Sequence, residues 1–223
     1  AEGLVEISTL ADADMVLIAI VGTAGLQPAL AAIEAGKDLA VASKEILVMA
    51  GELVMSAAAK KGVNVLPVDS EHNAIFQALD TRDPSAIAKI ILTASGGPCR
   101  NMSMQEMAAV TPEVAVRHPV WSMGAKISVD SATMFNKGLE LIEAARLFPV
   151  PESRIDVLVH PQSTVHGLVQ YTDGSVLAQC SPPNMKLPIA LGMSWPDRLD
   201  AVAPACDWTQ AATWTFEPLN ESV

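Results

Sequence analysis

The chain has 223 residues, half of them hydrophobic, and this content is enough to bury a core in one or two domains, which excludes a disordered chain. Its formal net charge of −11 argues against a surface for nucleic acid or an anionic membrane, because both bind basic patches. The apolar runs are too short to cross a bilayer. The three separated cysteines (Cys99, Cys180 and Cys206) are typical of reduced thiols in a cytosolic compartment.

Up to residue 69 the sequence alternates between strand and helix patterns. Apolar runs at 15–21, 39–43 and 63–68 are separated by the turn GTAG (22–25) with a helical segment to 36, and by a helical pattern at 45–60. This order predicts βαβ units and a parallel sheet. Ligands of such sheets lie beyond the carboxyl ends of the strands, where three polar clusters fall: GTAG, Ser43-Lys44-Glu45 and Asp69-Ser70-Glu71. The GxxG turn alone is weak evidence for nucleotide binding.

The segment PVDSEHNAIFQ (67–77) places two carboxylates two positions apart. If it is extended, Asp69 and Glu71 point the same way, and their charges repel unless a cation lies between them. Hard oxygen ligands of this kind suit Mg²⁺ or Mn²⁺. Alternatively, Asp69-Ser70 is ordinary turn or helix-cap chemistry and Glu71 belongs to a first helical turn.

The middle of the chain carries a glycine turn and a loop rich in large side chains. A helical pattern at 73–79 precedes a strand at 88–95, and the turn Ser95-Gly96-Gly97 is either an anion cradle or an ordinary turn. Residues 118–138 suit a mobile flap over a ligand, or equally a loop that packs its own apolar side chains.

A helix capped by Asp130 or Ser131 is predicted to follow, with apolar positions between 134 and 147. Asn136, Lys137 and Glu140 share one neighbourhood of its surface. They could grip a phosphate and a metal, although in isolation a solvated Lys137–Glu140 pair is the favoured interpretation.

Residues 155–180 are predicted to form two alternating strands joined by a hairpin at Thr172-Asp173-Gly174, which adds mixed or antiparallel sheet in an α+β unit. His160 and His166 lack a close third ligand, so core or hydrogen-bonding roles are favoured over zinc. The Pro- and Ala-rich segment after residue 196 indicates a connecting arm.

Taken together, the motifs VGTAGL, ASKE, PVDSEHNAIFQ, LTASGGP, HPVWSMGAKISVDSATMFNKGLE, HPQSTVHGLVQY and SPPNMKLPIA resemble the 1-deoxy-D-xylulose 5-phosphate reductoisomerase family over most of the chain. The resemblance implies isomerisation of 1-deoxy-D-xylulose 5-phosphate and reduction with NADPH to 2-C-methyl-D-erythritol 4-phosphate, in the non-mevalonate isoprenoid pathway. A divalent ion, Mg²⁺ or Mn²⁺ and possibly Co²⁺, would act as a Lewis acid.

The resemblance also assigns expected roles by motif. The metal carboxylates are Asp69, Glu71 and Glu140. The expected catalytic residues are Lys44, Glu71, His118 and Glu140. Substrate contacts are expected from Ser70, Ser95, His118, Trp121, Ser131, Asn136, Lys137 and His166, with Ser95, Ser131, Asn136 and Lys137 at the phosphate. Met123 lies near the hinge of the flap, and cofactor contacts are expected from Gly22, Ser43, Lys44, Glu45, Gly124 and Met185.

By this resemblance the chain is an internal part of such an enzyme, an α/β chain in which the latter part of a Rossmann-like parallel-sheet domain precedes an α+β catalytic domain. We expect a partial NADPH-binding domain at 1–69, the catalytic domain at 70–194 and a connecting arm at 195–223. Without the family's glycine-rich phosphate loop, this part alone is expected to bind NADPH poorly and to have negligible turnover. The family further implies a homodimer, in the bacterial cytoplasm or in the plastid stroma of a plant or alga.

Two other functions are compatible with the residues. One keeps the fold and changes the reaction, to an NAD(P)-dependent dehydrogenase or a metal-assisted aldolase on another sugar phosphate. The other is a truncated scaffold without catalysis, whose carboxylates only cap turns.

Overall fold

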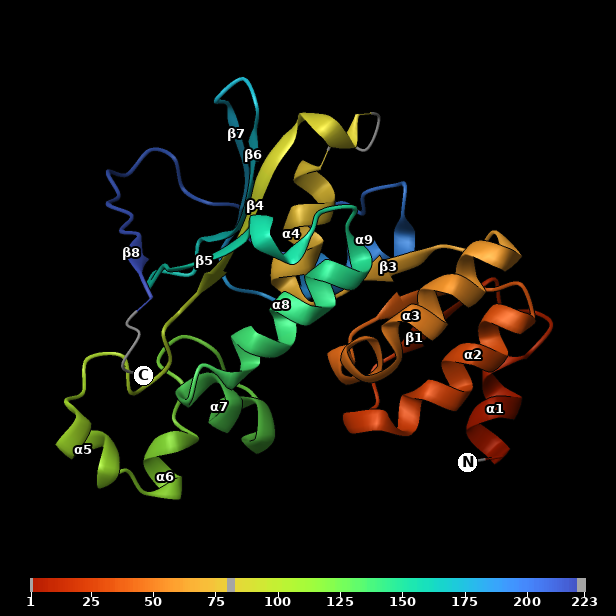
Figure 1. Ribbon diagram of the computed structural model, residues 1–223, viewed down its shortest axis with the longest axis horizontal. Coiled ribbons are helices and arrows are strands. Elements are labelled where there is room, and N and C mark those ends of the chain that lie inside the picture. Colours follow the sequence, from red (N-terminus) through yellow and green to blue (C-terminus); the bar gives the residue numbers. More distant parts are fainter. Residues whose placement is uncertain (1, 80–82, 220–223) are drawn as a thin grey trace.

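The computed structural model describes residues 2–79 and 83–219. Its first part is a parallel sheet in the order β1 (Met15–Ile18), β2 (Asp38–Val41) and β3 (Val65–Pro67). The predicted parallel sheet is confirmed. Around it lie α1 (Glu2–Ser8), which the sequence patterns did not predict, η1 (Gly22–Gly25), α2 (Leu26–Glu34) and α3 (Lys44–Lys61), all in red to orange in Figure 1.

The helices and strands of this part enclose an aliphatic core. Apolar side chains from β1, β2, α2 and α3 are buried together, among them Ile18, Ile33, Leu39 and Ile46. Helix α3 ends at Gly62, whose φ of +70° is a conformation that glycine adopts without strain. Because the three strands are parallel, their carboxyl ends stand at one edge of the sheet, as predicted for a ligand site.

The second part is a five-stranded mixed sheet in the order β7-β6-β4-β5-β8. Its strands are β4 (Ile87–Ala94), β5 (Ile155–Val159), β6 (Val165–Tyr171), β7 (Val176–Cys180) and β8 (Glu217–Pro218). The predicted mixed sheet and the β6–β7 hairpin are confirmed, with Gly174 at φ +91° in the turn. The run predicted as one strand from 155 to 171 is two, because β5 pairs parallel on one side of β4 and β6 pairs antiparallel on the other, so the chain must cross over at 160–164.

Helix α8 (Phe135–Leu147) lies between the two sheets, packed against α3 of the first part and in contact with β5 of the second (Figure 1). Helix α4 (Ser70–Ala78) covers β6 and β7, and α9 (Lys186–Ser194) contacts α4, β2 and β3. The remaining elements are η2 (Pro84–Ala86), α5 (Met104–Ala108), α6 (Pro112–Ala115), α7 (Ala125–Ala132) and η3 (Glu152–Arg154). A second apolar core, including Ile75, Ile90, Leu92 and Phe148, forms where α4 and α8 meet β4.

Of the two alternatives for residues 69–71, the helical one is confirmed, because α4 begins at Ser70 with Asp69 at its N-cap position and Glu71 in its first turn. A different local prediction is wrong. Asp130 and Ser131 do not cap the long helix but lie inside α7, and α8 begins separately after Met134, whose φ is +57°.

The expected apolar face of α8 is also wrong. Its buried positions are Lys137, Glu140, Glu143 and Ala144, whereas Phe135 is 58% exposed. This polar face is buried because α8 turns it towards the start of α4 and towards Lys44, where the charges find partners.

After α9 the described chain, up to residue 219, contains no helix and only the short strand β8. Cys99, Cys180 and Cys206 are free thiols, as expected. In the part of the chain that is described, no helix is long and apolar enough to cross a membrane.

Candidate active site

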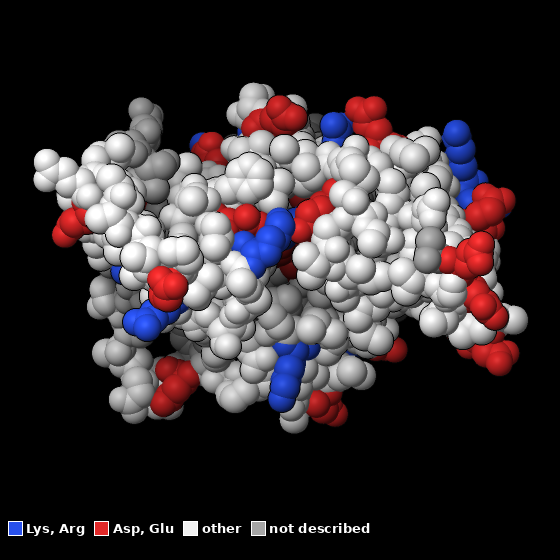
Figure 2. All heavy atoms as spheres, turned by 90° about the horizontal axis from the view of Figure 1, so that it is seen from below, with Lys and Arg blue, Asp and Glu red and all other residues white. Residues whose placement is uncertain are grey.

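One cavity of about 220 Å³ lies where the start of α4, the first turns of α8 and the loop at 118–123 meet. Figure 2 shows acidic and basic side chains side by side along a hollow in the middle of this face of the molecule. All the residues expected to bind metal or substrate, or to act in catalysis, line this cavity: Lys44, Asp69, Ser70, Glu71, Ser95, His118, Trp121, Ser131, Asn136, Lys137, Glu140 and His166. Met123 and Met185 line it too.

Three carboxylates from two distant segments converge in this cavity. One oxygen each of Asp69, Glu71 and Glu140 lies within 4.8 Å of the others. Asp69 makes no side-chain cap hydrogen bond to α4, so its carboxylate is not used as a helix cap. Because Mg²⁺ and Mn²⁺ prefer oxygen ligands that can approach from several sides, this donor set fits a hard divalent cation.

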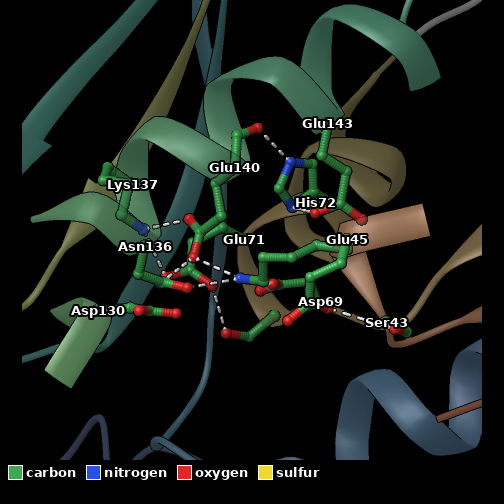
Figure 3. Close-up of polar contacts among 12 residues, drawn as sticks. Ser43, Glu45, Asp69, Glu71, His72, Asp130, Asn136, Lys137, Glu140 and Glu143 are labelled. Carbon is green, nitrogen blue, oxygen red and sulfur yellow. Dashed lines mark hydrogen bonds and ion pairs between the residues drawn. The ribbon is translucent and has the colours of Figure 1, made fainter. Parts of the chain in front are cut away.

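Two buried lysines, Lys44 and Lys137, neutralise the carboxylates. Figure 3 labels Lys137 beside Glu140 and Glu71. Lys44 Nζ contacts Asp69, lies 3.0 Å from Glu140 Oε1, and donates to Asn136 Oδ1 at 2.9 Å. Lys137 Nζ lies 2.8 Å from Glu71 Oε1, contacts Glu140, and donates to the carbonyl of Thr93. The solvated Lys137–Glu140 pair favoured from sequence is therefore wrong, because both side chains are buried.

The charges of this cluster set its pKa values. Burial alone would lower the pKa of Lys44 and of Lys137, but the nearby carboxylates outweigh burial and raise both. Burial would raise the pKa of Asp69, yet Lys44 holds it below its ordinary value. Asp69 is therefore ionised at neutral pH, in the form that a metal ligand requires.

Behind the cluster lie two further titratable groups, His72 and Glu143, both fully buried. Burial raises the pKa of Glu143 to about 7. Burial would lower the pKa of His72, but Glu143 and Asp69 outweigh it and raise the pKa.

The loop at 118–123 is tied to the glycine turn after β4. His118 Nδ1 accepts the backbone N–H groups of Val120 and Trp121, so its proton is on Nε2, which donates to Ser95 Oγ at 2.7 Å. Burial lowers the pKa of His118 and favours this neutral form. The ring of Trp121 lies 6.1 Å from that of His166, so the loop closes over one side of the cavity.

The turn Ser95-Gly96-Gly97 brings β4 against α7. Gly97 has φ +65°, and a Cβ there would lie 2.4 Å from the carbonyl oxygen of Ser131. Its N–H donates to Ser95 Oγ at 3.2 Å. Glycine is thus required at position 97 for Ser95 and Ser131 to approach each other. The backbone N–H of Gly97 already has a hydrogen-bond partner within the turn.

A second cavity of about 320 Å³ adjoins the first and shares Ala42, Lys44, Ile127 and Asn136 with it. Ser43, Glu45 and Gly124, three of the expected cofactor residues, line it. Gly22 lines neither cavity, but its carbonyl accepts a hydrogen bond from Ser43 Oγ at 3.1 Å.

Several residues of the site were missed from sequence. Ser163, with φ +49°, and Met134 both line the first cavity. Ser163 falls in the HPQST motif, so its position after a strand was an available signal. Nothing in the sequence pattern pairs His72 with Glu143, because only the packing of α4 on α8 brings them together.

The fold and the cavity define an α/β protein in which three converging carboxylates, a donor set that suits a divalent metal, lie beside a second cavity. Residues 1–51 match the family 1-deoxy-D-xylulose 5-phosphate reductoisomerase. Residues 65–148 match the 1-deoxy-D-xylulose 5-phosphate reductoisomerase C-terminal domain, and residues 180–223 the DXP reductoisomerase C-terminal domain. The chain belongs to the 1-deoxy-D-xylulose 5-phosphate reductoisomerase family.

Similar proteins carry the same name. The chain is 54% identical over 209 residues to the 1-deoxy-D-xylulose 5-phosphate reductoisomerase of Bifidobacterium longum (strain DJO10A) and 56% identical over 209 residues to that of Pseudarthrobacter chlorophenolicus. Both alignments cover 94% of this chain but 52% of the relative, so the chain spans about half the length of these proteins.

Solved structures agree in fold. A crystal structure of DOX-P reductoisomerase in complex with NADPH, fosmidomycin and magnesium has a TM-score of 0.94 and 48% identity, and the match covers 99% of this chain and 57% of that one. The Zymomonas mobilis enzyme in complex with NADPH has a TM-score of 0.91 and 49% identity over 99% of this chain and 57% of that one.

Proposed function

We propose that this chain forms the metal- and substrate-binding part of an NADPH- and divalent-metal-dependent reductoisomerase that converts 1-deoxy-D-xylulose 5-phosphate to 2-C-methyl-D-erythritol 4-phosphate. The observation that carries the proposal is the convergence of Asp69, Glu71 and Glu140 on one cavity that also holds Lys44 and Lys137. The relatives' shared name and the ligands of the solved neighbours support the same activity.

At the metal end, Asp69, Glu71 and Glu140 would hold Mg²⁺, Mn²⁺ or Co²⁺. When bound, the ion supplies Lewis-acid stabilisation of oxyanion character while a carbon–carbon bond migrates. Lys44 is buried among the same carboxylates and would donate hydrogen bonds to the substrate oxygens beside them. Ser70 donates to Glu71 Oε2 at 2.6 Å and orients that carboxylate.

At the phosphate end, we propose Ser95, Ser131, Asn136 and Lys137. In this structure Lys137 contacts Glu71 and Glu140 instead. Neutralising these carboxylates with a divalent ion would remove that attraction, and the ammonium group would then bind phosphate oxygens. Metal and phosphate binding are therefore expected to favour each other.

NADPH supplies the hydride when it is bound, and we propose the second cavity for its nicotinamide end. Ser43, Glu45 and Gly124 line this cavity and would contact the nicotinamide end, with Gly22 reached through Ser43. Met185 lines the first cavity and would contact the nicotinamide end from that side. Trp121 stands on the loop that closes the first cavity and would exclude water from the hydride transfer.

We further propose the division into a partial NADPH-binding domain at 1–69, a catalytic domain at 70–194 and an arm at 195–223. A homodimer is proposed because β7 is the edge of the mixed sheet and its Val176 and Leu177 are about half exposed. We propose a cytoplasmic location because the similar proteins are bacterial. Light scattering of the full-length protein tests the dimer.

The test of the function is product analysis with the full-length protein that contains this chain. Incubation with 1-deoxy-D-xylulose 5-phosphate, NADPH and Mn²⁺ should yield the branched polyol phosphate, identified by NMR, with matching loss of NADPH absorbance. Asp69→Asn and Glu140→Gln should abolish both. A straight-chain product would support the dehydrogenase or aldolase alternative instead, and turnover unchanged in both variants would refute the metal site.

A further inference from the structure

His72 on α4 and Glu143 on α8 form a pair behind the metal carboxylates, and both are fully buried (Figure 3). His72 Nε2 lies 2.8 Å from the backbone oxygen of Glu140, and His72 Nδ1 lies 3.5 Å from Glu143 Oε2. Within the described part of the chain, no hydrogen bond satisfies His72 Nδ1 or either carboxylate oxygen of Glu143. Buried polar atoms in this state require an explanation.

The hydrogen bond to Glu140 fixes the protons of this pair. A carbonyl oxygen only accepts, so His72 Nε2 must carry a proton and donate it. The remaining nitrogen faces Glu143, and one proton placed between them pairs His72 Nδ1 with Glu143 Oε2, whether it resides on the imidazole or on the carboxyl. In either form the pair is neutral overall, which is the arrangement that a fully buried place tolerates.

We propose that His72 and Glu143 are a positioning pair for the divalent-metal site. His72, in the first turn of α4 beside Glu71, contacts Glu140 and Glu143 in the second and third turns of α8. Holding Glu140 by its own backbone carbonyl fixes its carboxylate relative to Asp69 and Glu71. The inference rests on the proposed metal site, and neither residue touches the substrate cavity.

A second cation is the competing explanation, because ligand atoms of Asp69, His72 and Glu143 also lie within 4.8 Å of one another. Charge argues against it. Four carboxylates, the two lysines and the shared proton leave a charge of −1, which one divalent ion already reverses. A second ion in place of the proton would make the charge of this cluster +2, which is costly for buried groups.

The test is calorimetric titration of this chain with Mn²⁺, with thermal unfolding measured in parallel. The parent is expected to bind one ion. Glu143→Leu and His72→Leu should weaken binding about 10- to 100-fold, the usual effect of removing groups that orient metal ligands. Glu143→Gln should restore most of the affinity, because its amide N–H can donate to His72 Nδ1. Glu140→Gln, which removes a ligand, should abolish binding.

Phe148→Leu is the matched control, because the Phe148 ring stacks on that of His72 at 6.2 Å and its loss disturbs packing without removing a polar partner. It should lower the melting temperature and leave the affinity unchanged. If the leucine variants do not fold, His72→Asn replaces them. Asparagine keeps a polar partner for Glu143 but is too short to reach the Glu140 carbonyl, so weaker binding is again expected.

Weakened Mn²⁺ binding in the leucine variants or in His72→Asn, together with restored binding in Glu143→Gln, supports the positioning role of the pair. Parent affinity in those variants overturns the pair and leaves the metal site intact, as does an equal loss in Phe148→Leu. If the parent binds two ions and Glu143→Leu binds only one, His72 and Glu143 are ligands of a second ion, and the proposal is overturned. No binding in the parent would remove the proposed metal function, and the pair with it.

Discussion

Replacing Lys44 with methionine should destabilise the metal-free chain and enlarge its response to Mn²⁺. Lys44 is 5% exposed, and its ammonium group contacts Asp69 and Glu140. Methionine keeps the length and the apolar stem of the side chain but removes the charge. The variant therefore leaves buried carboxylates without one of the two cations that compensate them.

The size of the effect follows from the contacts. At the 3.0 Å that separates Lys44 Nζ from Glu140 Oε1, two unit charges attract by about 5 kcal/mol at an effective dielectric constant of about 20. Desolvation offsets part of this attraction, and removing one partner of a buried pair costs about 3–5 kcal/mol. For a chain of this size each kcal/mol shifts the melting temperature by about 2–4 °C, so we expect a fall of about 6–20 °C.

Thermal unfolding in EDTA and in Mn²⁺, followed by circular dichroism, measures both effects. Mn²⁺ at about 100 times its dissociation constant stabilises a binding protein by about 2.7 kcal/mol. This stabilisation by Mn²⁺ should be larger in Lys44→Met than in the parent, because no ammonium group of Lys44 competes with the ion at Asp69. Lys61→Met is the control: Lys61 pairs with Glu34 at 2.7 Å on the surface, where a salt bridge contributes less than about 1 kcal/mol. Equal shifts for Lys44→Met and Lys61→Met would refute the reasoning.

Three further predictions concern acid, the glycine turn and the metal carboxylates. The pKa of His118 in the folded chain lies below the ordinary 6.5, so its contribution to stability is complete above pH 6.5 and is lost as pH falls through the folded pKa. The difference in melting temperature between the parent and His118→Asn, scanned from about pH 8 to about pH 5, separates this contribution from those of His166 and Glu143. If that difference does not become smaller in acid, the assignment is contradicted. Gly97→Ala should cost more than about 1 kcal/mol in urea unfolding, since the methyl group meets a backbone carbonyl at 2.4 Å and φ is +65°; an unchanged midpoint would show that the turn relaxes freely. Glu140→Gln should free Lys137 from one of its carboxylate partners in the absence of metal, and should abolish the stabilisation of the chain by Mn²⁺. A melting temperature that still rises with Mn²⁺ would contradict the role of Glu140 as a metal ligand.

The parallel sheet could be predicted because its strands are short apolar runs separated by helical patterns and turns, signals that are local in sequence. Long helix α8 was located to within a few residues, but its start and its buried face were wrong. Propensity and periodicity treat a lysine and a glutamate as surface residues. Nothing local in α8 indicates that Lys137 and Glu140 meet the start of α4 and are buried there.

The sequence by itself determined the chemistry of the site: the motif residues, the hard oxygen ligands and the family they belong to. Tertiary structure alone decided how these residues meet. The crossing of the chain from β5 to β6 around β4 places Ser163 and His166 at the cavity, and the packing of α8 against α4 turns isolated charges into a neutralised cluster. The physical reason is that burial makes an unpaired charge costly: a carboxylate that water solvates at the surface needs a cation, a proton or a metal once water is excluded.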